Sequence, residues 1–156
     1  MLTTRRPVYK GSFTWSWNTT SGTSQATLGP SVYFRFNVVK VEAITFIDLA
    51  TGFPPLPAPS PLFVGVNEII PICFDYVAGT NVKTVGGAQW GGGAYLIVNE
   101  IMAPFKRTSE NVDLLRGSLT FNIYDSTGAI LTTPNPSYKA VTISFWESDE
   151  RISSTS

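Results

Sequence analysis

Acid–base chemistry in this chain would depend on carboxylates, because the sequence contains no histidine. The missing imidazole excludes Ser-His-Asp and Cys-His catalysis, and with them the histidine-dependent zinc and copper sites. A glycosidase needs two carboxylates that face one cleft about 5 to 10 Å apart. The candidates Glu68, Asp75 and Glu100 lie at the edges of expected strands, where their spacing does not make them converge. We therefore expect scattered surface charge and no enzyme activity.

The sequence also predicts neither a metal site nor a cofactor. Near the C-terminus, Glu147, Asp149 and Glu150 offer hard oxygen ligands, but they lack the spaced ligands and the turn glycine of a calcium loop. Cys73 is the single cysteine and cannot form an internal disulfide, which indicates a reducing compartment or a fold that needs no bridges. We expect it to be a small buried apolar residue.

Five glycines surround Trp90 in the segment 85–93. The segment does not match a phosphate-binding loop, because no Lys-Ser/Thr pair follows and the next residues are typical of a strand. One interpretation is a surface loop or a tight crossing of two strands, with Trp90 covering the end of the core. The other is a contact loop in which Trp90 anchors a partner.

Charge is sparse and balanced, with 11 basic and 11 acidic residues that make up 14% of the chain. Such a chain has no long-range field to attract nucleic acid or an anionic membrane, and low net charge favours association. The basic cluster Arg5, Arg6 and Lys10 is small for neutralising a genome, so we expect weak or absent contact with nucleic acid. No apolar stretch reaches bilayer length, and the first seven residues lack the apolar core of a signal peptide. We expect no membrane span and synthesis in the cytoplasm.

Alternating apolar and polar residues predict strands along most of the chain. In 12–17 the alternation places Phe13, Trp15 and Trp17 on one face. The longest strand-like stretch, 32–49, changes parity, which predicts bulges or a bend, and it places Lys40 and Glu42 as a solvated pair on its outer face. The turn residues 125–128 predict a hairpin. Further strands are expected at 62–70, 72–77, 95–98, 118–123 and 141–145.

Two segments interrupt this pattern. A single helix of about two turns is expected to begin at Ser109, which can cap it, and to end before Gly117. The proline-rich segment 53–61 has too many prolines for a helix or a central strand, and we interpret it as a stiff extended connector. Its alternative role is a docking peptide at 54–57.

Together these elements predict an all-β fold with one short helix, organised as a single antiparallel β-sandwich. A jelly roll is favoured over an immunoglobulin-like fold, because the single cysteine lacks the Cys-Trp-Cys spacing. The expected organisation is an N-terminal arm at 1–11, the sandwich at 12–147 and a polar C-terminal tail at 148–156. The expected core consists of Phe13, Phe34, Phe36, Leu119, Phe121, Ile143 and Phe145.

The closing segments 117–125 (GSLTFNIYD) and 140–146 (AVTISFW), together with the small size, the aromatic strands and the proline connectors, resemble viral jelly-roll capsid proteins. The resemblance covers the β pattern of most of the chain. It implies a structural subunit of a virion, of the minor capsid, vertex or spike type. Small coat proteins that package a genome carry a longer basic arm, which this chain lacks.

Assembly is the function that this composition favours, because burying apolar area between subunits contributes about 25 cal/mol per Å² before the costs of association. We expect homo-oligomers or complexes with other capsid proteins, located in the virion. The expected partner contacts are Arg5, Arg6, Phe53, Pro54, Pro57, Trp90 and Ile152.

The alternative function is a carbohydrate-binding, lectin-like sandwich that would recognise a glycan receptor. In it, exposed aromatic side chains would stack on sugar faces, and the candidates are Trp15, Trp17, Trp90 and Tyr95. Exposure separates the two functions, because a coplanar row of aromatic rings facing solvent favours sugar binding.

Overall fold

The computed structural model describes residues 8–28, 34–49, 60–70, 75–77, 79–90, 96–97, 106–114, 117–133 and 135–147. Within these ranges the chain forms strands and turns and contains no helix. The strands in chain order are β1 (Val8–Trp17), β2 (Thr23–Thr27), β3 (Phe34–Asp48), β4 (Ser60–Val66), β5 (Asp75–Tyr76), β6 (Lys83–Thr84), β7 (Gly86–Trp90), β8 (Leu96–Ile97), β9 (Lys106–Leu114), β10 (Ser118–Tyr124) and β11 (Ser137–Glu147).

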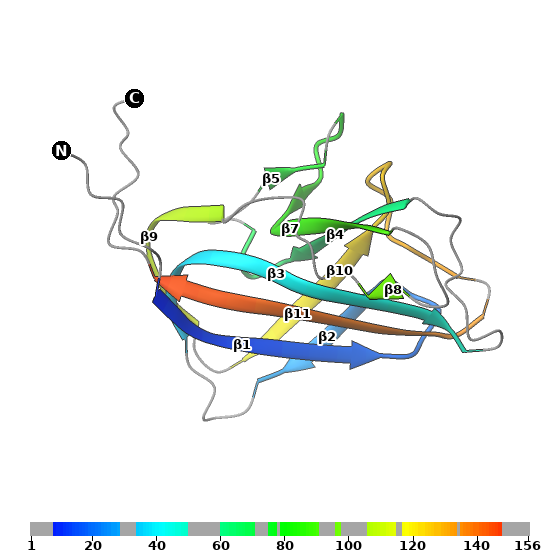
Figure 1. Ribbon diagram of the computed structural model, residues 1–156, viewed down its shortest axis with the longest axis horizontal. Helices are drawn as coiled ribbons and strands as arrows, with labels where there is room; N and C mark the ends of the chain where they lie inside the picture. The colour runs from blue at the N-terminus through cyan, green and yellow to red at the C-terminus, as the bar shows by residue number, and fades with distance from the viewer. Residues whose placement is uncertain are drawn as a thin grey trace.

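Two antiparallel sheets form the body of the protein, which confirms the predicted β-sandwich (Figure 1). The first sheet has the order β1-β11-β3, and both β8 and β9 pair with the far side of β3. The second sheet has the order β2-β10-β4-β7, and β5 pairs with β6 in a separate short ribbon. In Figure 1 the first sheet lies across the second, so each covers one face of the other.

Strand pairing is nested along the chain. The first strand pairs with the last, β1 with β11, and the second with the next to last, β2 with β10. Further in, β3 pairs with β8 and β9, and β4 pairs with β7. The chain therefore folds back on itself as one long hairpin would, and its successive strand pairs alternate between the two sheets.

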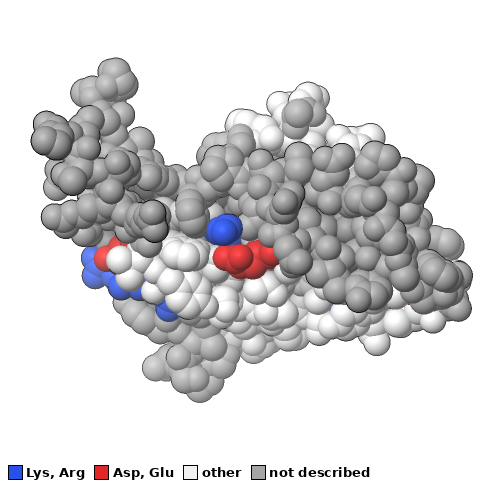
Figure 2. Space-filling view, viewed as in Figure 1, with Lys and Arg blue, Asp and Glu red and all other residues white. Residues whose placement is uncertain are grey.

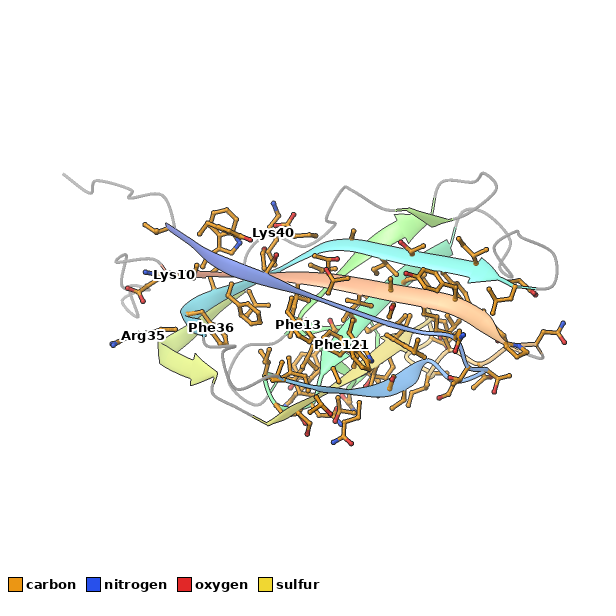
Figure 3. The ribbon with its side chains drawn as sticks, turned by 90° about the horizontal axis from the view of Figure 1, so that it is seen from below. Lys10, Phe13, Arg35, Phe36, Lys40 and Phe121 are labelled. Atoms are coloured by element: carbon orange, nitrogen blue, oxygen red, sulfur yellow. The ribbon has the colours of Figure 1, made fainter. Side chains whose placement is uncertain are left out.

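The hydrophobic core fills the space between the sheets. Phe13 of β1 and Phe121 of β10 stack across it with ring centroids 6.2 Å apart, and Figure 3 shows the two rings pointing toward each other. Phe36 and Phe145 meet within the first sheet at 4.8 Å. Phe13 is partly buried against this core, and the side chain of Phe34 lies outside the described part. The expected core residues found buried are Phe36, Leu119, Phe121, Ile143 and Phe145.

The predicted parity changes in β3 are confirmed as irregularities in its pairing. One register shift lies between Phe36 and Val38 opposite β9, and another lies where Glu42 is inserted opposite β11. At the first shift the extra residues lie in β9, where 108–111 separate the paired residues Arg107 and Val112. At the second, the extra residue Glu42 lies in β3 and resets which of its side chains face inward, as expected for a bulge. Consequently Val39 and Val41 on one parity and Ile44 on the other all reach the core.

The expected hairpin turn is confirmed at 125–128. The Asp125 N–H donates to the Ala129 carbonyl at 3.0 Å, and the Gly128 N–H donates to the Asp125 carbonyl at 3.1 Å. Gly128 has φ of 85°, a left-handed conformation that glycine adopts without strain. The turn returns the chain antiparallel to the end of β10, where Tyr124 bridges Ile130.

The helix expected from Ser109 is wrong, because this segment lies in β9. Strand β9 pairs antiparallel with β3, with Leu114 opposite Phe34 and Val112 opposite Phe36. A helix of two turns has little stability of its own in water, so a capping serine alone does not maintain it. Pairing along β3 offers a longer set of hydrogen bonds and overrides the local signal.

Residues 86–90 of the glycine-rich segment form strand β7, and Gly86 brings the two sheets close together. A Cβ atom on Gly86 would lie 2.8 Å from Cγ2 of Val41, which belongs to the opposite sheet. A Cβ atom on Gly87 would lie 2.6 Å from Cδ1 of Phe63. These distances agree with the tight-crossing interpretation, because a residue with a side chain does not fit at this approach.

Replacing Gly86 with alanine tests this close approach. We expect Gly86→Ala to lower the free energy of unfolding by about 1–3 kcal/mol, because the new methyl group overpacks the core against Val41. Urea denaturation of Gly86→Ala, Val41→Ala and the double variant measures the coupling. The loss in the double variant should be smaller than the sum of the single losses, and strictly additive losses would contradict the contact.

Candidate interaction surface

The outer face of the β1–β11–β3 sheet consists mainly of small uncharged side chains. Along β1 the exposed residues Ser12, Thr14 and Ser16 alternate with residues that face the core. Thr14 lies opposite Thr142 of β11, and their hydroxyl oxygens are 2.8 Å apart. Figure 2 shows that charged side chains are few on the described part of this face.

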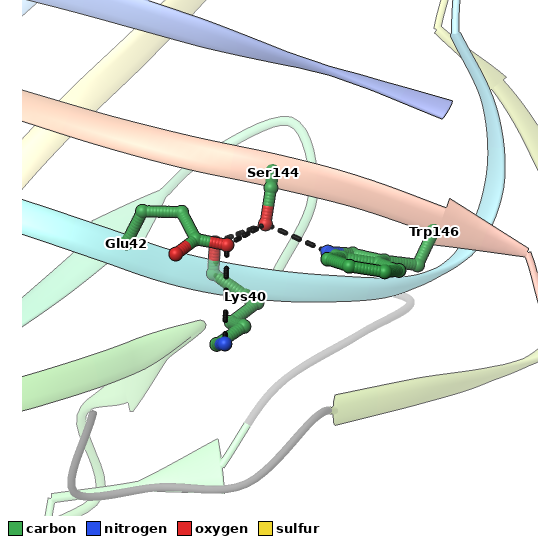
Figure 4. Close-up of polar contacts among 4 residues, drawn as sticks. All are labelled: Lys40, Glu42, Ser144 and Trp146. Atoms are coloured by element: carbon green, nitrogen blue, oxygen red, sulfur yellow. Dashed lines mark hydrogen bonds and ion pairs between the residues drawn. The ribbon is translucent and has the colours of Figure 1, made fainter. Parts of the chain in front are cut away.

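A chain of polar contacts runs from the middle of this face, at Lys40 and Glu42, to its end at Trp146 (Figure 4). The Trp146 indole N–H donates to the Ser144 hydroxyl at 2.7 Å, and that hydroxyl donates to Oε1 of Glu42 at 2.7 Å. Nζ of Lys40 lies 4.0 Å from the same carboxylate oxygen. The predicted Lys40–Glu42 surface pair is therefore confirmed. The carboxylate is also fixed by a neighbouring strand, which the sequence did not indicate.

Aromatic side chains lie at the end of the face where β1 begins. The ring of Tyr9 meets Trp146 edge to face with centroids 5.2 Å apart, and Tyr9 is 53% exposed. Val38, which lies opposite Trp146, is also buried at this end, although it is not part of the main hydrophobic core. Figure 3 places Lys10 and Arg35 at this same end of the sandwich. The end therefore combines an exposed aromatic group with basic residues.

The carboxylates considered for catalysis do not form a site in the described residues. Glu68 accepts hydrogen bonds from the N–H and the hydroxyl of Thr120, at 2.6 and 3.1 Å, so it attaches its loop to β10. The side chains of Asp75 and Glu100 lie outside the described part. No group of three histidine, cysteine, aspartate or glutamate residues that could hold a metal occurs where the structure is described.

Asp125 is also occupied in a structural role. Burial alone would raise the pKa of this carboxyl, but hydrogen bonds from the Thr127 side chain and from the turn amides of Thr127, Ala129 and Gly128 lower the pKa overall. The carboxylate closes the turn after β10 in the manner of an Asx turn.

Lys139 is a buried cation that the sequence reasoning missed. It is fully buried, and its ammonium donates to the Thr19 carbonyl and the Ser137 hydroxyl, both at 2.6 Å. Nζ also lies 5.6 Å from the centre of the Phe46 ring. Burial lowers the pKa of Lys139 to about 8. The alternation that places Val141 inward also places Lys139 inward, so the strand pattern contained a signal for it.

The tryptophans of β1 do not form an exposed row. The indole N–H of Trp15 donates to the Ser24 hydroxyl of β2 at 3.0 Å, and that of Trp17 donates to the Ser21 carbonyl at 2.8 Å. Trp17 is buried, and Trp15 is partly buried against the core. Both indoles bond toward the side of the sandwich between β1 and β2.

Most of the expected partner contacts lie outside the described residues. These are Arg5, Arg6, Phe53, Pro54, Pro57 and Ile152, and the same holds for Cys73 and Tyr95. Trp90 lies in β7 opposite Ser60, and its side chain is not described. Strand β1 begins at Val8, inside the segment expected to be an N-terminal arm.

Comparison with known proteins finds no match, either to a protein-family model or to a curated protein. No helix long and apolar enough to cross a bilayer occurs among the residues described above. The function is therefore argued from the geometry of this chain.

The buried Lys139 predicts a pH-dependent stability. Its folded pKa of about 8 lies below the ordinary lysine value of 10.5, so between these pH values the unfolded chain binds more protons. The free energy of unfolding should therefore rise with pH in this window, and between pH 7 and 10 this group should add about 2 kcal/mol.

Urea denaturation across this pH range measures the effect. Lys139→Met should remove this rise, whereas Val141→Ala, a destabilising change on the same strand without a titrating group, should retain it. An equal pH slope in the wild type and in Lys139→Met would contradict the assignment.

Proposed function

We propose that this protein is a jelly-roll capsid subunit, a structural protein of the virion that assembles with copies of itself or with other capsid proteins. The observation that carries the proposal is the nested pairing of β1 with β11, β2 with β10, β3 with β9 and β4 with β7. These eight strands are divided between two sheets as β1-β11-β3-β9 and β2-β10-β4-β7. Double-sheet jelly rolls of eight strands are typical of viral capsid and lectin domains.

Surface chemistry supports assembly as the activity of this fold. The outer face of the first sheet presents serine, threonine, alanine and tyrosine side chains, and the charges at its centre, Lys40 and Glu42, lie close to each other. With 11 basic and 11 acidic residues, copies of the chain do not repel one another through net charge. Contacts between copies would therefore depend on shape and uncharged groups, and they would respond little to salt.

The position of the aromatic residues favours the capsid proposal over the carbohydrate-binding alternative. A lectin of the expected kind needs tryptophan rings facing solvent, whereas Trp15 and Trp17 turn toward the core and bond to Ser24 and Ser21. Trp17 is buried and Trp15 is partly buried, so these two rings do not form an exposed row.

Light scattering after size-exclusion chromatography, followed by electron microscopy, tests the proposal. The purified full chain should form oligomers of defined size as its concentration rises, without bound nucleic acid and with little change between low and high salt. A strictly monomeric species at the highest soluble concentration would contradict self-assembly. A monomer that binds glycans on an array would favour the alternative.

A further inference from the structure

The backbone edge of β1 that faces away from β11 has no partner in the described structure. Strand β1 is the outer strand of its sheet in Figure 1 and pairs on one side only. In an antiparallel pair every second residue turns its N–H and C=O away from the neighbouring strand. No backbone hydrogen bond of the described residues reaches this outer edge of β1. Such an edge can accept another strand.

The first part of β1 is protected against pairing, and the second part is not. A register shift lies between Tyr9 and Gly11, Lys10 adds a charge there, and Gly11 has φ of 151°. Bulges and lysines of this kind block edge-to-edge contact. Residues 12–17 continue without charge, proline or bulge. The open edge is therefore the segment 12–17.

We infer that residues 12–16 pair antiparallel with the same residues of a second copy, around a twofold axis at Thr14. This pairing would join the two first sheets into one continuous sheet. It deepens the proposed function, on which it rests, by naming one contact through which copies assemble.

The side-chain pattern limits the possible registers to those that keep inward residues opposite inward residues, and a centre at Thr14 fulfils this. Residues directly opposite each other lie on the same face, so the inward Phe13 must oppose an inward residue of the second copy. Centring the pair on Thr14 places Phe13 opposite Trp15, an aromatic pair, and Ser12 opposite Ser16. The pairing ends at Ser12 and Ser16, before the bulge at Gly11.

Self-pairing fits this edge better than a charged foreign strand. All the paired positions between 12 and 16 are uncharged, so the two identical segments bring no like charges together. The exposed faces would match serine with serine and threonine with threonine, pairs that stabilise antiparallel sheets. A second copy of this chain is therefore the partner that the edge fits.

Charge substitutions at Thr14 test the register, because in it Thr14 faces itself. Thr14→Lys and Thr14→Glu each place like charges directly opposite, so each should weaken association on the order of tenfold. An equimolar mixture of the two variants should associate again as a heterodimer. The matched controls Ser126→Lys and Ser126→Glu, in the exposed turn after β10, should associate as the wild type does. Analytical ultracentrifugation measures the wild type, the four variants and the mixture.

The outcomes separate the two proposals. Wild-type assembly that neither Thr14 variant weakens would overturn β1 pairing and leave the capsid proposal standing. A monomeric wild type would contradict both.

Hydrogen–deuterium exchange of the wild type gives a readout that does not depend on the variants folding. Amides in 12–16 should exchange more slowly at concentrations where the chain assembles, whereas amides of the turn 125–128 should not change. Equal exchange in 12–16 at both concentrations would overturn the inference.

Discussion

The ladder between β3 and β11 is the constraint on which the rest of the structure depends. It runs from Val38 opposite Trp146 to Asp48 opposite Ser137, and it joins segments about a hundred residues apart in the sequence. Because β11 lies between β3 and β1, this ladder determines where the first strand of the chain must pair. The bulge at Glu42 keeps both halves of β3 facing the core. The same bulge brings the Glu42 carboxylate to Ser144.

Nested pairing of distant strands has an entropic cost, which the contacts between the two sheets must offset. Each outer pair encloses the pairs inside it, so the entropy of closing a long loop must be overcome before the distant contacts contribute. The close approach at Gly86 and Val41 and the stacking of Phe13 on Phe121 then connect the two sheets. Lys139 connects β11 to the turn after β1 through Thr19. The position of β1 therefore depends on contacts with both sheets.

The sequence predicted the features that depend on neighbouring residues. Alternation in β1 and β10 placed Phe13 and Phe121 inward, and the parity changes of β3 predicted its bulges, because side-chain direction in a strand follows directly from spacing. Features that depend on distant strands could not be predicted in this way. Ser109 looked like a helix cap because β3, with which its strand β9 pairs, is remote in the sequence.

The candidate surface shows the same division between local and distant effects. The Lys40–Glu42 pair was predictable from its spacing, whereas the bonds to Ser144 and Trp146 depend on a strand a hundred residues away. The open edge of β1 could not be recognised from sequence either, because whether a strand is central or outer depends on the order of the sheet. Topology, rather than residue type, decides which backbone groups lack a partner.

Among the described residues, three charged groups are engaged by contacts within the fold. Glu68 is bound to Thr120, Asp125 closes a turn, and the Lys139 ammonium is held inside the sandwich. Moving the buried Lys139 ammonium would leave its hydrogen-bond partners in the sandwich unsatisfied, which costs about 1–3 kcal/mol. The alternating N–H and C=O groups along the outer edge of β1 are different, because water is their alternative partner. A strand from another chain can bond to these N–H and C=O groups one after another. The uncharged side chains at 12–17 do not oppose its approach.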